Sequence, residues 1–174
     1  MQGADALKLI TTGGNKDLSD DSIFRQFRSD LSKSGVTASH VGDSSKAIVK
    51  ANKVLELEYE MPMQAHAAME PLCATASVTN DECNIWAPVQ NQDGVMGVAM
   101  AVTNLPPEKI NINTTFLGGG FGRKFEVDFL VGPLVASKVM GKPVKVIWKR
   151  EEDTRNDFFK PPTLAKMRIG LDSN

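Results

Sequence analysis

Apolar and polar residues alternate along several short stretches of this chain, and the alternation predicts strands there. The most regular stretch covers residues 55–60, where every second residue is apolar. Such alternation is typical of a strand with one buried face. Comparable stretches predict further strands over 110–116, 144–148 and 164–171.

Two more β-like stretches, on either side of residues 79–82, predict a hairpin. If Val78 faces Cys83 across it, Cys73 faces Pro88, and the two sulfur atoms lie roughly 17 Å apart along the ribbon. A disulfide requires Cα atoms within about 7 Å of each other. We therefore expect two free thiols. A count of two cysteines without a C-x-x-C motif also disfavours a zinc site.

Other stretches have the spacing of helices. Residues 23–31 place their apolar side chains on one side, after cap candidates at 19–22. Residues 93–102 indicate a short helical or mixed segment, and residues 125–140 a longer helix. Residues 1–14 indicate the end of a helix with no cap before it, which suggests a cut from a longer chain. Helices and strands are mixed without steady β-α-β alternation, which favours an α+β fold with mixed sheets and flanking helices.

Composition narrows the classes of partner. The chain has 174 residues, of which 41% are hydrophobic and 24% charged, with a net charge of −1. These values are typical of a globular protein, and the balanced charge provides no field to attract nucleic acid. No apolar run approaches the roughly 20 residues of a membrane helix. We expect neither a nucleic-acid partner nor a membrane span, while the compartment, cytoplasmic or periplasmic, stays open.

The most informative motif is the run Gly118-Gly119-Gly120-Phe121-Gly122-Arg123-Lys124, called the glycine turn below. Glycines allow positive φ angles and close approach to another group. A strand, a glycine-rich turn and a helix start together form an anion-binding site, because unpaired N–H groups and the helix dipole point at the turn. The adjacent Arg123 and Lys124 favour an anionic partner. The alternative is a tight structural connection.

The two common nucleotide motifs do not match the glycine turn. A P-loop requires a serine or threonine after its lysine, and Phe125 follows Lys124 here. A dinucleotide fingerprint starting at Gly118 requires a third glycine where Arg123 stands.

Polar residues elsewhere offer further candidates. His66 and Glu70, four residues apart, could share a helix face and bind a metal, but no second histidine lies nearby in sequence. A hydrogen-bonded pair or a pocket wall is the preferred interpretation. Gln90 follows a predicted strand, and its amide can both donate and accept hydrogen bonds. Residues 150–153 indicate a solvated face or a helix start.

The motifs occur in a recognisable order: Tyr59-Glu60-Met61-Pro62, His66-x-x-Met69-Glu70-Pro71, Trp86-Ala87-Pro88-x-Gln90, the glycine turn, and Trp148-x-Arg150-Glu151-Glu152-Asp153. In this order they resemble the large, molybdenum cofactor-binding subunit of the xanthine dehydrogenase/aldehyde oxidase family. The similarity is strongest to the isoquinoline 1-oxidoreductase β-subunit branch and related bacterial aldehyde dehydrogenases, and it covers most of the chain.

The resemblance implies a molybdopterin cytosine dinucleotide cofactor carrying molybdenum. Gln90 falls on the family glutamine that hydrogen-bonds the apical oxo ligand. Residues lining the cofactor would be Gly119, Gly120, Phe121 and Gly122, with Arg123 nearby. Purine-oxidising members carry Lys-Glu closely after the last glycine, whereas the acidic residue here, Glu126, is displaced by one position.

The resemblance also implies a domain organisation. Residues 1–60 would end a hammerhead-like α/β region, and residues 61–174 would start the first molybdopterin-binding domain. The general-base glutamate of the family lies far beyond this segment, so we expect no catalytic residue here and no turnover by the isolated chain.

The parent would hydroxylate aldehydes or N-heteroaromatics with oxygen from water. Its partners would be the rest of the large subunit and an iron–sulfur small subunit. The alternative is a non-catalytic anion-binding or oligomerising module derived from the family. In either case, exposed apolar surface could drive homo-oligomerisation.

Overall fold

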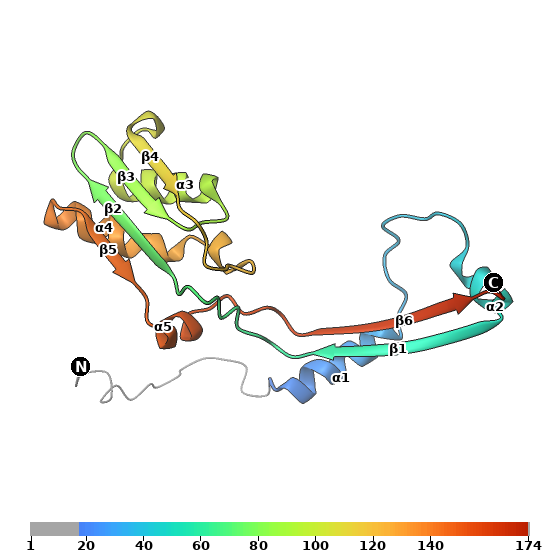
Figure 1. Ribbon diagram of the computed structural model, residues 1–174. Coiled ribbons are helices and arrows are strands. Elements are labelled where there is room, and N and C mark those ends of the chain that lie inside the picture. The colour runs from blue at the N-terminus through green and yellow to red at the C-terminus, as the bar shows by residue number, and fades with distance from the viewer. Residues whose placement is uncertain (1–17, 174) are drawn as a thin grey trace. The chain divides into compact units, whose positions relative to one another are not determined.

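The computed structural model describes residues 18–173, and these form two compact units that are described separately (Figure 1). The first unit combines the chain up to Pro62 with the segment from Pro162 onward, and the second runs from Met63 to Pro161. The helix end expected over residues 1–14 lies outside the described residues. The assignment of 1–60 and 61–174 to two family domains stays a prediction.

The first unit is built on a two-stranded antiparallel ribbon of β1 (Lys53–Met61) and β6 (Thr163–Leu171). Both strands were predicted from alternation, and both are confirmed. Helices α1 (Asp20–Leu31) and α2 (Ser44–Lys50) pack on it. The predicted cap region is confirmed, since Ser19 is the N-cap and forms a capping box with Ser22, and α1 begins at Asp20, three residues before the predicted start.

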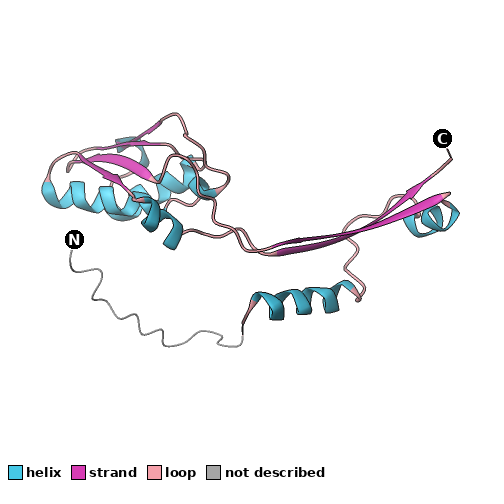
Figure 2. Cartoon of the chain, turned by 60° about the horizontal axis from the view of Figure 1, so that its bottom comes forward, coloured by secondary structure: helices cyan, strands magenta, loops and turns pink. Residues whose placement is uncertain are grey.

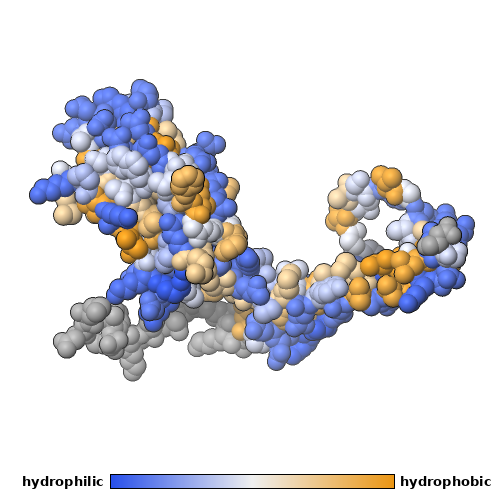
Figure 3. All heavy atoms as spheres, in the orientation of Figure 1, coloured by the Kyte–Doolittle hydropathy of each residue, from blue (hydrophilic) through white to orange (hydrophobic). Residues whose placement is uncertain are grey.

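The two faces of the ribbon differ in character. On the face with α1, Arg28 forms ion pairs with Glu58 and Glu60, and Arg168 pairs with Glu56 across the strands. On the opposite face, directly paired residues such as Leu57 and Met167 are apolar, and apolar surface is visible along the ribbon in Figure 3. The apolar side chains of this face that are 39–52% exposed are Leu57, Tyr59, Met61, Met167, Ile169 and Leu171.

The second unit contains a four-stranded mixed sheet in the order β4-β3-β2-β5. Its strands are β2 (Cys73–Val78), β3 (Cys83–Ala87), β4 (Ile110–Thr114) and β5 (Val144–Ile147). The predicted hairpin is confirmed, because β2 and β3 pair antiparallel with Val78 opposite Cys83. Both thiols are free, as expected.

One face of this sheet is covered by α3 (Gln92–Thr103) and α4 (Val131–Met140), which also contact each other (Figure 2). The core lies between the helices and the sheet, and includes Leu72, Ile85, Val95, Leu130 and Leu134, each at most 1% exposed. The predicted α+β class with mixed sheets and flanking helices is therefore confirmed.

The long helix predicted over 125–140 is wrong in its first half. Two 3-10 turns, Arg123–Phe125 and Asp128–Leu130, precede α4, which begins only at Val131. Pro133 explains the start, since a proline lacks an N–H group and is tolerated only in the first turn of a helix. The helix dipole expected behind the glycine turn is consequently absent from this position.

The remaining helical segments are short, and one of them is a 3-10 turn, Pro107–Lys109, just before β4. The acidic–basic run expected to start a helix does so, as α5 (Arg150–Arg155). The helix α2 was not predicted, because its seven residues span too few turns to show a clear apolar period.

Candidate functional site

Strand directions bring four separate segments to one edge of the four-stranded sheet. Strands β3 and β4 are parallel, so the segments that follow them, Gln90 and the glycine turn, lie at the same edge. Strand β2 is antiparallel to β3 and β5, which brings the segment 66–70 before β2 and helix α5 after β5 to that edge too. The topology thus assembles the motifs that the sequence singled out.

Gln90 contacts the glycine turn directly. Its side-chain Oε1 accepts a hydrogen bond from the N–H of Gly122 at 3.3 Å, and its own backbone N–H donates to the carbonyl of Lys124 at 3.0 Å. A Cβ atom on Gly120 would lie 2.5 Å from the same Oε1. Gly120 must therefore be a glycine if the Gln90 amide is to stay where it is.

The backbone of the turn takes conformations that most residues avoid. Gly119 and Gly122 have φ angles of +93° and +105°, and Phe121 has +55°. A positive φ at a bulky residue such as Phe121 is a strained conformation of the kind that clusters at functional sites. Gly118 is held against Glu70, whose carboxylate accepts from its N–H at 3.0 Å.

Several donors at the turn have no partner within residues 18–173. The backbone N–H groups of Gly119, Gly120 and Phe121 make no hydrogen bond there, and neither does the NH₂ group of Gln90. Three consecutive N–H groups without partners, in a turn with positive φ angles, are donors suited to anionic or oxygen-bearing ligands. These N–H groups are the donors that the turn offers in place of the predicted helix dipole.

The two cations of the turn are neutralised internally. The guanidinium of Arg123 is 2% exposed; it donates to both oxygens of Asp128 at 2.8 and 2.9 Å, and its Nε lies 3.1 Å from Asp157 Oδ1. That last contact lacks hydrogen-bond geometry, which leaves the buried Nε–H without a hydrogen-bond partner in the described chain. The Arg123 side chain is thus directed into the protein.

Lys124 is fully buried and its ammonium lies 2.5 Å from Glu70 Oε2. Partial burial would raise the pKa of Glu70, but hydrogen bonds from Lys124 and from the Gly118 N–H outweigh it and hold that pKa below its usual value. Burial and the nearby Glu70 charge raise the pKa of the Cys73 thiol.

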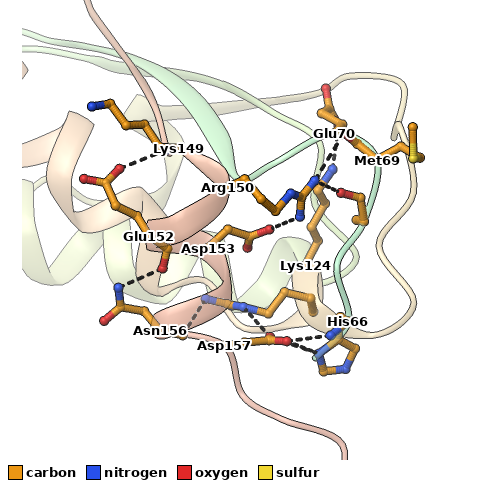
Figure 4. A network of polar contacts seen from close by, with 12 residues as sticks. His66, Met69, Glu70, Lys124, Lys149, Arg150, Glu152, Asp153, Asn156 and Asp157 are labelled. Carbon is orange, nitrogen blue, oxygen red and sulfur yellow. Dashed lines mark hydrogen bonds and ion pairs between the residues drawn. The ribbon is translucent and has the colours of Figure 1, made fainter. Parts of the chain in front are cut away.

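The segment 66–70 is a loop rather than the helix considered for His66 and Glu70, and the two side chains have different partners. Asp157 accepts from the His66 backbone N–H at 2.6 Å and lies 3.0 Å from His66 Nδ1. Arg150 donates to the carbonyl of Ala68, which fixes the middle of the loop (Figure 4). The expected hydrogen-bonded pair of His66 and Glu70 is therefore wrong, because Asp157 is the partner of His66 and Lys124 that of Glu70.

Sequence reasoning missed the carboxylates of this network, Asp128 and Asp157. Asp157 stands in a polar stretch that the pattern assigns to solvent, although its side chain is 2% exposed. Asp128 stands in the stretch predicted as a helix over 125–140. Their only signal is the presence of two adjacent cations, Arg123 and Lys124, in a glycine turn, since buried cations require buried acids.

In residues 18–173, no three histidine, cysteine, aspartate or glutamate side chains come together as a metal-binding group. Within the same residues no helix combines the length and apolar character needed to cross a bilayer.

Known proteins with similar sequences are large oxidoreductase subunits. The chain is 31% identical over 130 residues to a membrane-bound aldehyde dehydrogenase (pyrroloquinoline-quinone) of Gluconacetobacter polyoxogenes, covering 74% of this chain and 17% of that protein. It is 31% identical over 137 residues to the aldehyde oxidoreductase molybdenum-binding subunit PaoC of Escherichia coli, covering 78% and 19%. It is 31% identical over 116 residues to the isoquinoline 1-oxidoreductase subunit beta of Brevundimonas diminuta, covering 67% and 14%.

The fold is shared with solved structures of the same group. The aldehyde oxidoreductase from Desulfovibrio desulfuricans superposes with a TM-score of 0.59 at 21% identity, over 75% of this chain and 15% of that one. The chain thus spans less than a fifth of the length of these relatives. A family model described as a molybdopterin cofactor-binding domain matches residues 27–174. The match extends over most of the chain, which therefore belongs to the molybdopterin cofactor-binding domain family of the molybdenum hydroxylases.

Proposed function

We propose that this chain forms one wall of the molybdenum cofactor site in a hydroxylase of aldehydes or N-heteroaromatic compounds. The single observation that carries the proposal is the contact between Gln90 and the glycine turn. Beside this contact, at the same sheet edge, the Gln90 NH₂ group and three consecutive backbone N–H groups have no partner within residues 18–173.

The residues present fit such a cofactor. A molybdopterin carries phosphate oxygens, and its metal carries oxygen ligands; both kinds accept hydrogen bonds, which the free donors of Gln90, Gly119, Gly120 and Phe121 can supply. The cytosine dinucleotide form, which adds a second phosphate, is part of the proposal. When bound, the cofactor supplies two-electron redox chemistry.

The protein residues have positioning roles in this proposal. Gly122 donates to Gln90 Oε1, so the amide is oriented with its NH₂ group free to donate. Because a backbone N–H can only donate, the atom it meets must be the amide oxygen, which fixes the amide orientation. Arg123 contributes through Asp128 and Asp157, which hold its side chain in the interior and anchor the turn.

No residue of this chain is proposed as the general base. Glu70 is engaged by Lys124 and its pKa is lowered, so it is a poor proton acceptor. In the proposed reaction, an aldehyde and water give a carboxylic acid, two protons and two electrons. The base would come from the rest of the large subunit, and the electrons would leave through an iron–sulfur partner subunit.

The proposal is tested on the full-length gene product, produced with its neighbouring genes in a host that makes molybdenum cofactors. We expect one molybdenum per protein, release of a cytosine nucleotide from the pterin, and oxidation of benzaldehyde or isoquinoline with an artificial electron acceptor. Pure protein that oxidises these substrates without molybdenum would overturn the proposal, as would protein that never acquires molybdenum.

Two glycine variants make the test specific to the Gln90 contact. Gly120→Ala places a Cβ against the end of the Gln90 side chain, which can move, so the protein should fold but lose at least tenfold in molybdenum content or activity. Gly132→Ala, at an exposed position in α4 with no heavy atom within 4 Å of the new Cβ, is the matched control and should retain both. If the two variants have equal molybdenum content and activity, Gln90 is not part of the cofactor site.

The alternative, a non-catalytic anion-binding module, is not favoured. Its main support was the pair of cations in the turn, and both are neutralised by carboxylates of this chain. With Arg123 and Lys124 occupied, the free donors of the turn are neutral amides, which suit a cofactor held by many contacts better than a free anion.

A further inference from the structure

His66 has one ring nitrogen whose role the proposed function leaves unassigned. Nε2 makes no hydrogen bond to any residue between 18 and 173. It remains accessible although the side chain as a whole is 10% exposed, since Arg123 Nε is the one buried side-chain nitrogen or oxygen of these residues that lacks a partner. An accessible acceptor without a partner in these residues is open to a ligand.

The contacts of Asp157 determine which nitrogen of His66 carries the proton. Asp157 faces three donors: the backbone N–H of His66, its ring Nδ1 and the Nε of Arg123. A carboxylate beside these donors only accepts, so Nδ1 must be the protonated nitrogen. Neutral His66 then carries a lone pair on Nε2 and can accept one hydrogen bond.

The direction of Nε2 places this acceptor beside the glycine turn. A Cβ atom built on Gly122 would lie 3.6 Å from Nε2, an ordinary contact distance, so the space between them has room for about one heavy atom. In Figure 4 the second ring nitrogen lies on the side of the imidazole away from Asp157. Gly122 thus has the Gln90 amide on its N–H side and the His66 imidazole on its Cα side.

We propose that His66 is a ligand-binding residue whose Nε2 accepts a hydrogen bond from an N–H or O–H group of the molecule bound at the glycine turn, and that Asp157 is the positioning residue that orients it. The inference rests on the proposed function for the identity of that molecule, a reduced pterin. Pterins carry ring and exocyclic N–H donors, which the backbone N–H groups of the turn cannot recognise. His66 supplies the acceptor that the site otherwise lacks.

Residue substitutions separate this role from simple packing. Asp157→Asn offers one oxygen to the two N–H groups of His66 and removes the charge that faces Arg123, so the imidazole loses its fixed orientation. His66→Gln removes the ring acceptor, and the chain offers an internal control because it contains only two histidines. His40, the second one, is exposed and lies in the other compact unit.

The first measurement is long-range ¹H–¹⁵N correlation NMR on the 174-residue chain. We expect neutral His66 to carry its proton on Nδ1 and to leave Nε2 as the acceptor. We expect Asp157→Asn to shift the tautomer populations. A predominant Nε2–H form in the wild-type chain would overturn the inference.

The second measurement is a titration of the same chain with two probes. Tetrahydropterin, which carries N–H donors, should move the Nε2 resonance of His66 and leave His40 unchanged. Inorganic sulfate, an anion that carries no donor at pH 8, should not move it. No response to the pterin, or an equal response of His66 and His40, contradicts the inference.

The third measurement distinguishes the two proposals. In the full-length gene product, His66→Gln should lower molybdenum retention after dialysis at least tenfold, whereas His40→Gln should not change it. Wild-type protein without molybdenum defeats the proposed function, whereas the NMR results still decide the role of His66. If the wild-type protein and the His66→Gln variant retain molybdenum to the same degree, the inference about His66 fails and the proposed function is unaffected.

Discussion

Glu70 and Lys124 are the residues whose pairing most directly supports the glycine turn. Lys124 is fully buried, and Glu70 also accepts from the N–H of Gly118. Glu70→Gln would leave the ammonium without a counter-charge, and breaking a buried pair from one side costs about 3 kcal/mol. We expect the free energy of unfolding at pH 7, measured by urea denaturation, to fall by roughly that amount. In a Lys124→Met background, Glu70→Gln should lower the free energy of unfolding by much less.

The pair also predicts a dependence of stability on pH. The pKa of Glu70 is lower in the folded chain than its ordinary value, so the unfolded chain binds the proton more readily. This contribution to stability is fully present above about pH 4.3, the ordinary pKa of a glutamate. It is lost as the pH falls through the lower pKa of the folded chain. The difference in stability between wild type and Glu70→Gln should therefore shrink on acidification, and a constant difference would contradict the ion pair.

At the scale of elements, α3 contains two glycines whose replacement by alanine should change the stability of the chain in opposite directions. Gly97 is exposed in the helix interior with no heavy atom within 4 Å of a new Cβ, so Gly97→Ala should stabilise the chain by up to about 1 kcal/mol. Gly94→Ala would place its Cβ 2.6 Å from the amide of Asn91, the N-cap that accepts from the Gly94 N–H. Loss of that cap costs about 1 kcal/mol. Thermal unfolding followed by circular dichroism should give opposite shifts, and two equal shifts would contradict the cap geometry.

The elements also show what the sequence could and could not predict. Alternation predicted β1, β6 and the β2–β3 hairpin, because the period of a strand is a local property of its side chains. It could not predict that β3 and β4 run parallel, which is the pairing that brings Gln90 to the glycine turn. Helix-like spacing also predicted a helix start at Phe125, where the structure has 3-10 turns and α4 begins only at Val131. Asp157 was missed because a carboxylate in a polar stretch is usually solvated.

At the scale of the whole molecule, the apolar face of the β1–β6 ribbon is the surface most in need of a partner. Both helices of that unit contact its other face, where Arg28 pairs with Glu58 and Gly170 lies against α2. The relatives are more than five times longer than the matched segment. We therefore expect the rest of the large subunit to cover the apolar face, and the isolated chain to bind hydrophobic dye and to self-associate.

A cross-strand pair allows this expectation to be tested without breaking the ribbon. Leu57 and Met167 are directly opposite, so Leu57→Glu combined with Met167→Lys replaces an apolar pair by an attractive charged pair. In the isolated chain, dye binding and self-association on size-exclusion chromatography should fall at least twofold. In the full-length gene product, the same double variant should lower the unfolding temperature, because a covered face would now bury charges.

The matched control exchanges Glu56 and Arg168, an exposed ion pair on the opposite face. This exchange should leave dye binding, self-association and the unfolding temperature unchanged. An unchanged unfolding temperature of the double variant would show that the face stays in water, and a discrete wild-type dimer converted to monomer would assign it to a second copy.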